Sequence, residues 1–487
     1  MNSKRLSVGL VGLLLWLSGA WGVGSGTWGV VTYALLPTPY TLQSPSIPAE
    51  GLAQAIAAAA PGDTINVQGG IYHGRLIINK PLTLIGHDWP VIDGGGEGSV
   101  VQITAPGTTV RGFLIQNSGD SLDQENTGIV VEAPNTLVTD NRFEQTLFGI
   151  YLRQASNSVV RGNLIHSKPL DVPRRGDGIR VWYSNDVLIE NNTVEMGRDV
   201  VLWYSERLTV RGNVVNNGRY GLHFMYCDDA HIVQNRLTNN SVGAFLMYSR
   251  RMIMENNTVA GNRGPSGYGI GLKDMDDAIV RDNLFLDNRV GAYLDGSPRE
   301  VDSIGHFQRN VFGYNDIGVE MMPAVRHNEF MGNSFVDNDE QVAIAGGGSS
   351  AANNRWTVAD QGNYWSDYAG FDANGDGFGD IAYSSERLFE NLVAQEPNLR
   401  LFLYSPAINT LDFAAKAFPI VRPQPKLVDE RPFMTPTIPS QAPALPRPAV
   451  SWWFVAAFLL LLLAWGIVQL TRLRQHPYRL PQLEKQP

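Results

Sequence analysis

The sequence contains very little cysteine: Cys227 is the only one in 487 residues. A single thiol excludes an intrachain disulfide, so the fold must be held by its core even in an oxidising compartment. The sequence also has no basic stripe, and its formal net charge of −9 argues against a nucleic-acid partner. A phosphate-binding loop of the form G-x-x-x-x-G-K-[ST] is absent too, so any ATP hydrolysis must come from other chains.

Segments typical of helices are also scarce, whereas glycine is abundant. Fifty glycines and many Asn-containing turns separate short runs of β-branched and aromatic residues. This composition favours a strand-rich repeat structure.

The N-terminal segment predicts export. Lys4 and Arg5 precede an apolar run that ends in small residues, which indicates a secretory signal peptide at 1–20. A first membrane anchor is the alternative, and either form exports the chain that follows. A flexible segment is expected at 21–45.

A second apolar run lies near the C-terminus. Residues 452–470 carry no charge and are long enough to cross most of a hydrocarbon core about 30 Å thick. They predict a single transmembrane helix at 451–471. Arg472 and Arg474 follow it, so the tail at 472–487 is expected to be cytoplasmic and the rest of the chain to lie on the outer face of the membrane.

The central part of the sequence is repetitive. Between residues 128 and 339 a unit of about 22 residues recurs: a small or turn residue, a strand, a polar turn, a second strand, and an asparagine followed two places later by an apolar residue. Most steps are 21 to 23 residues, and longer steps mark surface insertions. The repeat asparagines are Asn141, Asn163, Asn192, Asn213, Asn235, Asn257, Asn283, Asn310 and Asn333.

Alternate side chains of a strand point to opposite faces, which divides each unit into inward and outward positions. In the strand after Gly221, Leu222 and Phe224 are inward, whereas His223 and Met225 are outward. The same count places these further residues inward: Ile179, Val181, Val200, Leu202, Ala244 and Leu246, and, in a third short strand, Phe143, Val194, Leu237, Phe285 and Phe335.

Three short strands per coil are typical of a right-handed parallel β-helix, which we predict over 46–345. Asparagine suits the coil corner, because its amide tolerates left-handed backbone and can hydrogen-bond to the equivalent group in the next coil. A solenoid must cap its ends, and residues 51–63 are expected to form a short amphipathic helix over the first coil. A C-terminal cap with an acidic, glycine-rich loop is expected at 346–405, and a proline-rich, extended tether at 406–450.

Several segments carry a resemblance to one known family. They are GLHFMYCDDAHIVQNR, VGAFLMYSRRMIMENN, GYGIGLKDMDDAIVRDN, VGAYLDGSP and GNYWSDY. A β-helix repeat alone is shared by many unrelated proteins, but the LKD run and the NYWSDY segment are specific. Over roughly residues 45 to 405, the sequence resembles the NosD family of periplasmic, copper-handling β-helix proteins of nitrous oxide reductase maturation in denitrification.

The resemblance implies a role and partners. Its implied partners are an ABC transporter with separate membrane and ATPase subunits, a copper chaperone, and nitrous oxide reductase. The implied role is accessory rather than enzymatic: delivery of copper, or support of sulfur delivery, for assembly of the copper–sulfur centre of the reductase.

Soft donor atoms gather on the predicted outward face. Copper(I) prefers thioether, thiolate and imidazole ligands. His223, Met225 and Cys227 alternate along one strand, and Met247 lies one coil above Met225, about 4.8 Å away. Met322 also falls at an outward position. These five residues are the candidate contacts for a transient copper ion.

The equivalent positions in two neighbouring coils hold large aromatic side chains. Trp182 and Trp203 are therefore predicted to form one outward apolar ladder with Met225 and Met247. Such ladders usually mark a docking surface. Docking without metal, contact with copper, and simple packing under a loop all fit this pattern.

The acidic loop has the spacing of a calcium-binding loop. Asp372, Asn374 and Asp376 stand at its first, third and fifth positions, with Asp380 at the ninth. The twelfth position is Tyr383 instead of a bidentate glutamate. A weak calcium site and a turn without an ion are both consistent with this segment.

An enzyme acting on polysaccharides, a lyase or an epimerase, is the main alternative. Only Arg180 and His223 among the central outward positions could act as a base, and those positions hold no carboxylate pair. That set is poor for glycoside hydrolysis. A surface adhesin is a further alternative.

Overall fold

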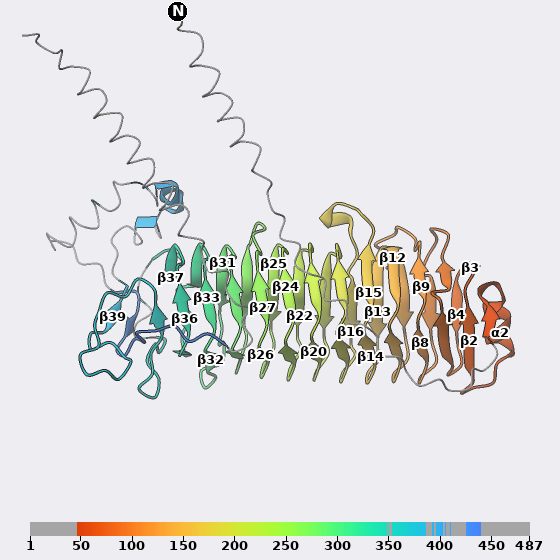
Figure 1. Ribbon diagram of the computed structural model, residues 1–487, viewed down its shortest axis with the longest axis horizontal. Coiled ribbons are helices and arrows are strands. Elements are labelled where there is room, and N and C mark those ends of the chain that lie inside the picture. Colours follow the sequence, from red (N-terminus) through yellow and green to blue (C-terminus); the bar gives the residue numbers. More distant parts are fainter. Residues whose placement is uncertain are drawn as a thin grey trace, which may run out of the picture. The chain divides into compact units, whose positions relative to one another are not determined.

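The computed structural model is a right-handed parallel β-helix in which short strands stack along one axis (Figure 1). The predicted signal peptide, flexible segment, transmembrane helix and cytoplasmic tail lie outside the described residues. Within the described ranges, no helix is long and apolar enough to cross a bilayer. The structure describes residues 46–347, 349, 353–385, 392–393, 396–402, 405, 410 and 425–439.

Each coil contributes one strand to each of three parallel sheets, as the repeat predicts. Sheet A contains β1 (Ser46–Pro48), β2 (Thr64–Gln68), β5 (Thr83–His87), β8 (Thr109–Arg111), β11 (Leu137–Thr139), β14 (Val159–Arg161), β17 (Leu188–Glu190), β20 (Thr209–Arg211), β23 (His231–Val233), β26 (Ile253–Glu255), β29 (Ile279–Arg281), β32 (Gly305–Gln308) and β35 (Asn328–Met331). Sheet B contains β3 (Ile71–His73), β6 (Val91–Asp93), β9 (Leu114–Gln116), β12 (Arg142–Thr146), β15 (Leu164–Ser167), β18 (Thr193–Glu195), β21 (Val214–Asn216), β24 (Arg236–Thr238), β27 (Thr258–Ala260), β30 (Leu284–Leu286), β33 (Val311–Gly313), β36 (Ser334–Val336) and β38 (Tyr364–Trp365). Sheet C contains β4 (Leu76–Ile78), β7 (Val101–Ile103), β10 (Thr127–Val131), β13 (Phe148–Arg153), β16 (Ile179–Trp182), β19 (Asp199–Trp203), β22 (Tyr220–Met225), β25 (Val242–Met247), β28 (Tyr268–Lys273), β31 (Val290–Asp295), β34 (Ile317–Met321) and β37 (Glu340–Ile344). The remaining elements are η1 (Ala49–Gly51), α2 (Leu52–Ala58), η2 (Val172–Arg174), η3 (Pro397–Phe402) and an antiparallel pair, β39 (Tyr383–Ser384) and β40 (Val428–Asp429).

The core fills the space between the three sheets. Every residue that the sequence places inward is buried in it, because the alternation holds within each strand. At the N-terminal end, α2 covers the first coil as predicted, with Leu52 and Ile56 buried. Lys80 Nζ donates hydrogen bonds of 2.7 to 3.2 Å to three carbonyl oxygens at the C-terminal end of this helix, which satisfies acceptors that have no partner within the helix.

The repeat asparagines form a continuous hydrogen-bonded ladder. Asn213 Nδ2 donates to Oδ1 of Asn235 (3.0 Å) and to the carbonyl oxygen of Ile189 (2.9 Å), and Asn213 Oδ1 accepts from the backbone N–H of Asn192 (2.9 Å). The expectation of left-handed backbone at these asparagines is wrong. The positive φ falls one residue earlier, for example at Asn191 (φ 53°), because the ladder amide must face inward to reach both neighbouring coils.

Residues 425–439 close the C-terminal end of the solenoid. Leu427 is fully buried, and the carboxylate of Asp429 accepts a hydrogen bond from Trp365 Nε1 (2.9 Å). Part of the range 406–450, where an extended tether was expected, is therefore packed against the last coil.

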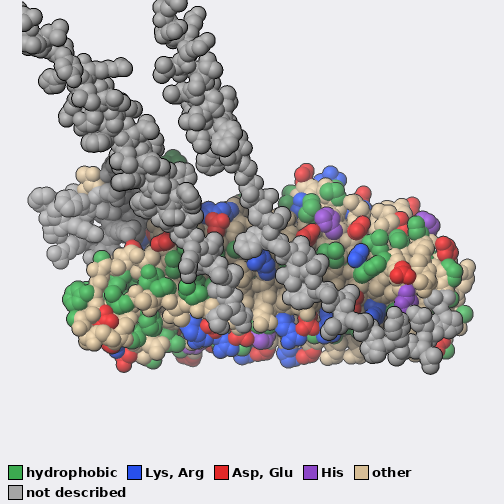
Figure 2. All heavy atoms as spheres, in the orientation of Figure 1, with side chains coloured by type: hydrophobic (Ala, Val, Ile, Leu, Met, Phe, Trp, Pro, Cys, Tyr) green, Lys and Arg blue, Asp and Glu red, His purple; other side chains and the backbone are tan. Residues whose placement is uncertain are grey.

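The turns that lead into sheet A carry alternating charges. Equivalent side chains in stacked coils are about 4.8 Å apart, so like charges at one position would repel each other. Arg207 binds both carboxylate oxygens of Asp186 (2.8 and 2.9 Å), and Arg251 binds both of Asp229 (2.7 and 2.9 Å). Figure 2 shows acidic and basic side chains intermixed along the edge of the solenoid that carries sheet A.

Candidate functional site

The predicted outward ladder lies on sheet C. The strand register pairs Trp182 with Trp203, Trp203 with Met225, and Met225 with Met247. All four side chains are partly exposed, and the two indole rings lie 5.5 Å apart. Because adjacent strands are about 4.8 Å apart, the two thioether side chains are neighbours. Lys273 pairs with Met247 on the next strand and ends the apolar strip.

His223 faces the same side of sheet C, in the adjacent row, but it is covered. It is 7% exposed, and its ring centre lies 4.7 Å from that of Tyr220 and 5.2 Å from that of Trp203. Its Nδ1 is 3.7 Å from Oδ2 of Asp199. His223 therefore faces a buried polar cluster, whereas the side chain of Met225 reaches the surface.

The prediction that Cys227 faces outward is wrong. Strand β22 ends at Met225, and Tyr226 has a positive φ of 55°, so the alternation of faces stops there. Cys227 turns into the core with no exposed surface; its backbone N–H donates to Ser249 Oγ (2.8 Å) and its thiol donates to the carbonyl oxygen of Leu202 (3.0 Å). Burial raises the pKa of this thiol to about 12, so it is protonated and a poor copper ligand.

Met322 does not join the other candidates. Strand β34 ends at Met321, which pairs with Leu294 in the core, and Met322 after it is partly buried and packs against that core. Strands β28 and β31 separate its strand from the one that carries Met247. At about 4.8 Å per strand, the separation is roughly 14 Å, which is too far for one shared ion.

A second aromatic ladder flanks the first, and the sequence-based prediction missed it. Tyr183, Tyr204, Tyr226 and Tyr248 are stacked face to face, with ring centres 5.0 to 5.2 Å apart. Each has a positive φ, between 49° and 55°. The signal is the Trp-Tyr or Met-Tyr pair that recurs at the ends of β16, β19, β22 and β25. The exposed aromatic surface is therefore wider than the Trp–Met ladder alone.

The sequence-based prediction also missed two buried carboxylates, because they stand before the strand positions to which inward and outward faces were assigned. Asp177 and Asp199 are 1% and 2% exposed. Arg198 Nη2 lies 3.0 Å from Asp177 Oδ1, and Arg219 Nε donates to Asp199 Oδ1 (3.0 Å). Burial raises the pKa of Asp177 to about 6. Burial also acts to raise the pKa of Asp199, but the neighbouring His223 and Arg219 outweigh it and lower that pKa.

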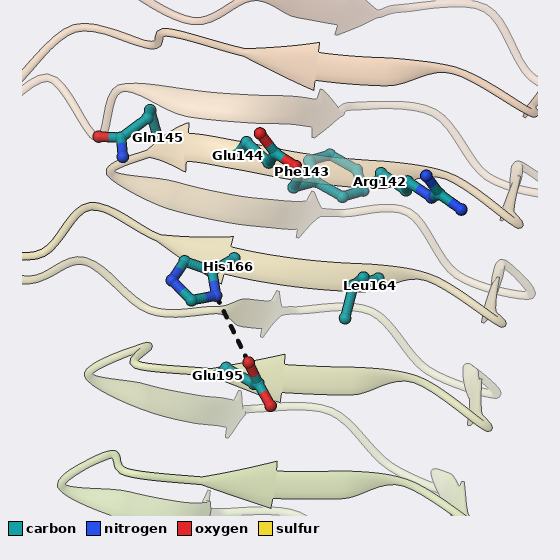
Figure 3. Close-up of a pocket in the computed structure, with 7 residues that line it drawn as sticks. All are labelled: Arg142, Phe143, Glu144, Gln145, Leu164, His166 and Glu195. Atoms are coloured by element: carbon teal, nitrogen blue, oxygen red, sulfur yellow. Dashed lines mark ion pairs between the residues drawn. The ribbon is translucent and has the colours of Figure 1, made fainter. Parts of the chain in front are cut away.

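An open cavity of about 320 Å³ lies over sheet B (Figure 3). Glu144, His166 and Glu195 line it in register on β12, β15 and β18, and His166 Nδ1 is 3.4 Å from Glu195 Oε2. No group of three His, Cys, Asp or Glu side chains within the described ranges is arranged to hold a metal ion. The cavity and the predicted copper contacts therefore belong to different sheets.

The four calcium candidates, Asp372, Asn374, Asp376 and Asp380, share one exposed loop. Asp372 Oδ2 accepts the backbone N–H of Gly377 (2.8 Å), and this contact helps to lower the pKa of Asp372. The other three side chains also accept backbone N–H groups of this loop. These contacts are those of a turn that needs no ion, and the calcium site stays a prediction.

The fold and this surface define a class: a right-handed parallel β-helix with an exposed aromatic and methionine surface on one sheet. Residues 163–370 match the profile of the family described as "Periplasmic copper-binding protein (NosD)". A relative from Pseudomonas aeruginosa, named "Probable ABC transporter binding protein NosD", is 30% identical over 406 residues, 79% of this chain and 93% of the relative. A protein of the same name from Stutzerimonas stutzeri is 28% identical over 381 residues, 75% of this chain and 85% of that protein. The chain belongs to the NosD family.

Solved structures with similar folds are more distant. The mannuronan C-5 epimerase AlgE6 A-module of Azotobacter vinelandii has a TM-score of 0.47 and 16% identity, covering 65% of this chain and 94% of that one. The surface protein and adhesin PfbA of Streptococcus pneumoniae has a TM-score of 0.42 and 13% identity, covering 61% and 94%. Similarity at this level carries no information about activity.

Proposed function

We propose that this chain is an extracytoplasmic accessory protein that works with an ABC transporter to deliver copper, or to support sulfur delivery, for assembly of the copper–sulfur centre of nitrous oxide reductase. The family description and the relatives' names support the copper and transporter parts of this proposal. In this role the chain is not an enzyme. The helix predicted at 451–471 would hold it beside the transporter, where a copper chaperone and the reductase are its further partners.

The observation that carries the proposal is the pairing of two thioethers with two indoles on one exposed surface. Met225 and Met247 lie on adjacent strands and are in register. Thioethers favour Cu(I) over harder ions. Two such ligands leave the coordination shell of the ion incomplete. A partner that docks on Trp182 and Trp203 supplies the remaining ligands, and the ion passes across the interface.

The test uses two double variants, one of the methionine pair and one of the tryptophan pair, so that copper transfer and partner binding are measured separately. Met225→Leu with Met247→Leu keeps volume and apolarity but removes both sulfur atoms, so partner binding should persist while copper transfer to the reductase falls. Trp182→Ala with Trp203→Ala should instead weaken partner binding, by about 2 kcal/mol or more for an interface tryptophan.

The matched control is Met252→Leu with Met254→Leu, since both of these methionines are buried in the core. It should leave binding and copper transfer unchanged. If both surface double variants behave like this control, the copper route does not use this surface.

A further inference from the structure

Three buried nitrogen atoms on the outer face of sheet C have no hydrogen-bond partner among the described residues. They are Nε of Arg180, Nε1 of Trp203 and Nδ1 of His223. The guanidinium carbon of Arg180 lies 6.0 Å from the centre of the Trp203 ring. That ring meets the His223 imidazole edge to face at 5.2 Å. The three side chains therefore form one contiguous cluster.

The chemistry of these atoms indicates what the cluster recognises. An arginine Nε and an indole Nε1 can only donate hydrogen bonds. Folded proteins rarely leave buried donors unpaired. Two such donors, with the imidazole beside them, thus indicate a binding site for a hydrogen-bond acceptor.

The surroundings favour an anion over a water molecule. Arg180 packs over the rings of Tyr151 (5.1 Å) and Trp182 (5.2 Å). Three carboxylates also border the cluster, and each is paired. Glu125 binds Arg180 (2.8 Å), Asp177 lies 4.0 Å from Arg180 and binds Arg198, and Asp199 lies 3.7 Å from His223 and binds Arg219. A water molecule must place two protons of its own on acceptors; the aromatic walls provide none, and the nearby carboxylates of Asp177 and Asp199 already accept from Arg198 and Arg219. An oxyanion only accepts hydrogen bonds, and the guanidinium attracts its charge.

Two connections border this cluster. The first is residues 117–126, between β9 and β10; it carries Glu125, whose Oε1 accepts from Arg180 Nη1 (2.8 Å). The second is the insertion at 168–177, which makes the step from Asn163 to Asn192 longer than its neighbours. Lys168 Nζ ties it to the first connection by donating to the carbonyl oxygen of Ser118 (2.6 Å). A ligand bound at these buried atoms would have to pass between the two connections.

We propose that Arg180 and Trp203, with His223 beside them, form a binding site for a small oxyanion. The ligand is either a carboxylate, such as one carried by a partner protein, or a free inorganic oxyanion. The site is separate from the thioether pair and needs no copper. It assigns His223 to anion binding rather than to the copper contact.

The test is NMR of the full-length chain with 15N-labelled tryptophan. Replacement by Trp203→Phe identifies the Trp203 indole signal among those of the 11 tryptophans. Sodium sulfate and sodium acetate are then titrated against sodium chloride at constant ionic strength. The Trp203 signal should shift and saturate with at least one of them. Tighter binding of sulfate would indicate an inorganic oxyanion as the ligand, and tighter binding of acetate would indicate a carboxylate.

Variants decide whether the shift reports this site. Arg180→Gln should abolish saturation, whereas Trp89→Phe, which removes an exposed indole that packs on Arg142 outside the cluster, should keep the affinity. Arg180→Lys retains the charge facing Glu125 and lacks Nε, so it should weaken binding about tenfold even if Arg180→Gln does not fold. No saturation with either anion, or an affinity unchanged in Arg180→Lys, would overturn the proposal. Ordered water would then be the hydrogen-bond partner of these donors.

Discussion

At the scale of single residues, the direction of a side chain depends on where its strand ends. The alternation of faces places Met225 and Met247 correctly because both lie within strands. It fails at Cys227, two residues past Met225, because Tyr226 takes left-handed backbone. A non-glycine residue with positive φ is uncommon, and nothing in the local spacing marks Tyr226 as one.

The buried position of Cys227 predicts an unreactive thiol. In the folded chain, alkylation by iodoacetamide should be far slower than in the unfolded chain, because the reactive thiolate is scarce when the pKa is about 12. Cys227→Ser should keep fold and copper transfer, since Ser205 and Ser249 occupy the equivalent positions in the neighbouring coils. Rapid labelling of the native protein, or loss of copper transfer in Cys227→Ser, would restore Cys227 as a copper ligand.

Asp177 predicts a stability that depends on pH. Its pKa is raised from 3.8 to about 6 by burial, so the folded state binds this proton more tightly than the unfolded state does. The stabilisation is complete below pH 3.8 and is lost as the pH rises through 6. Over that range, the free energy of unfolding should fall by roughly 2 to 3 kcal/mol more in the wild type than in Asp177→Asn. Denaturant titrations of both proteins measure the difference, and identical pH profiles would contradict it.

At the scale of elements, hydrogen-bonded ladders connect one coil to the next. A second asparagine ladder, which the sequence analysis missed, repeats five residues after the first and consists of Asn240, Asn262, Asn288, Asn315 and Asn338. Buried amides in this arrangement leave few polar groups unpaired at the corners.

The central asparagine ladder can be tested at Asn213. Asn213→Ala removes its bonds to both neighbouring coils and leaves their buried partners unsatisfied, which should cost roughly 2 to 4 kcal/mol of unfolding free energy. Asn216→Ala in the same coil is the control, because that side chain is half-buried. It makes a long hydrogen bond to Glu195 (3.5 Å) and an exposed one with Asn217 (2.9 Å), and neither leaves a buried partner. Equal losses in denaturant titrations of the two variants would contradict a special role for the ladder.

Most of the element-scale structure could be predicted from the sequence. The spacing of Asn141 to Asn333 gives the coil length, and the alternation around Leu222 gives the core, because stacked coils impose one environment on equivalent residues. The buried pair of Asp177 and Asp199 could not be predicted, since both residues stand just before the regular alternation of their strands and Asp199 lies at a register shift between β19 and β22. The tyrosine ladder could not be predicted either, because it depends on the left-handed backbone of the residue that follows each of its four strands.

At the scale of the whole molecule, the ends of the solenoid must be covered. An uncovered parallel edge offers unpaired backbone groups to a second copy. At the C-terminal end, residues 425–439 provide the cover, and Asp429 fixes them through Trp365 Nε1 and the backbone N–H of Asn363 (2.6 Å).

Loss of this cover should lower stability and promote association. Asp429→Ala leaves the Trp365 and Asn363 donors unpaired, so the melting temperature should fall and larger species should form with increasing concentration. Glu430→Ala is the control, because that neighbouring side chain is exposed. Thermal unfolding with light scattering measures both effects. A monomeric Asp429→Ala protein with an unchanged melting temperature would show that the segment does not protect the edge.

The most direct test of the proposed function is the copper content of nitrous oxide reductase purified from a strain that lacks this chain. The reductase should be exported but short of its copper–sulfur centre. Supplying the wild-type chain should restore that centre, and supplying Met225→Leu with Met247→Leu should restore it only partly. A fully loaded, active reductase from the deletion strain would contradict a role for this protein in copper-centre assembly.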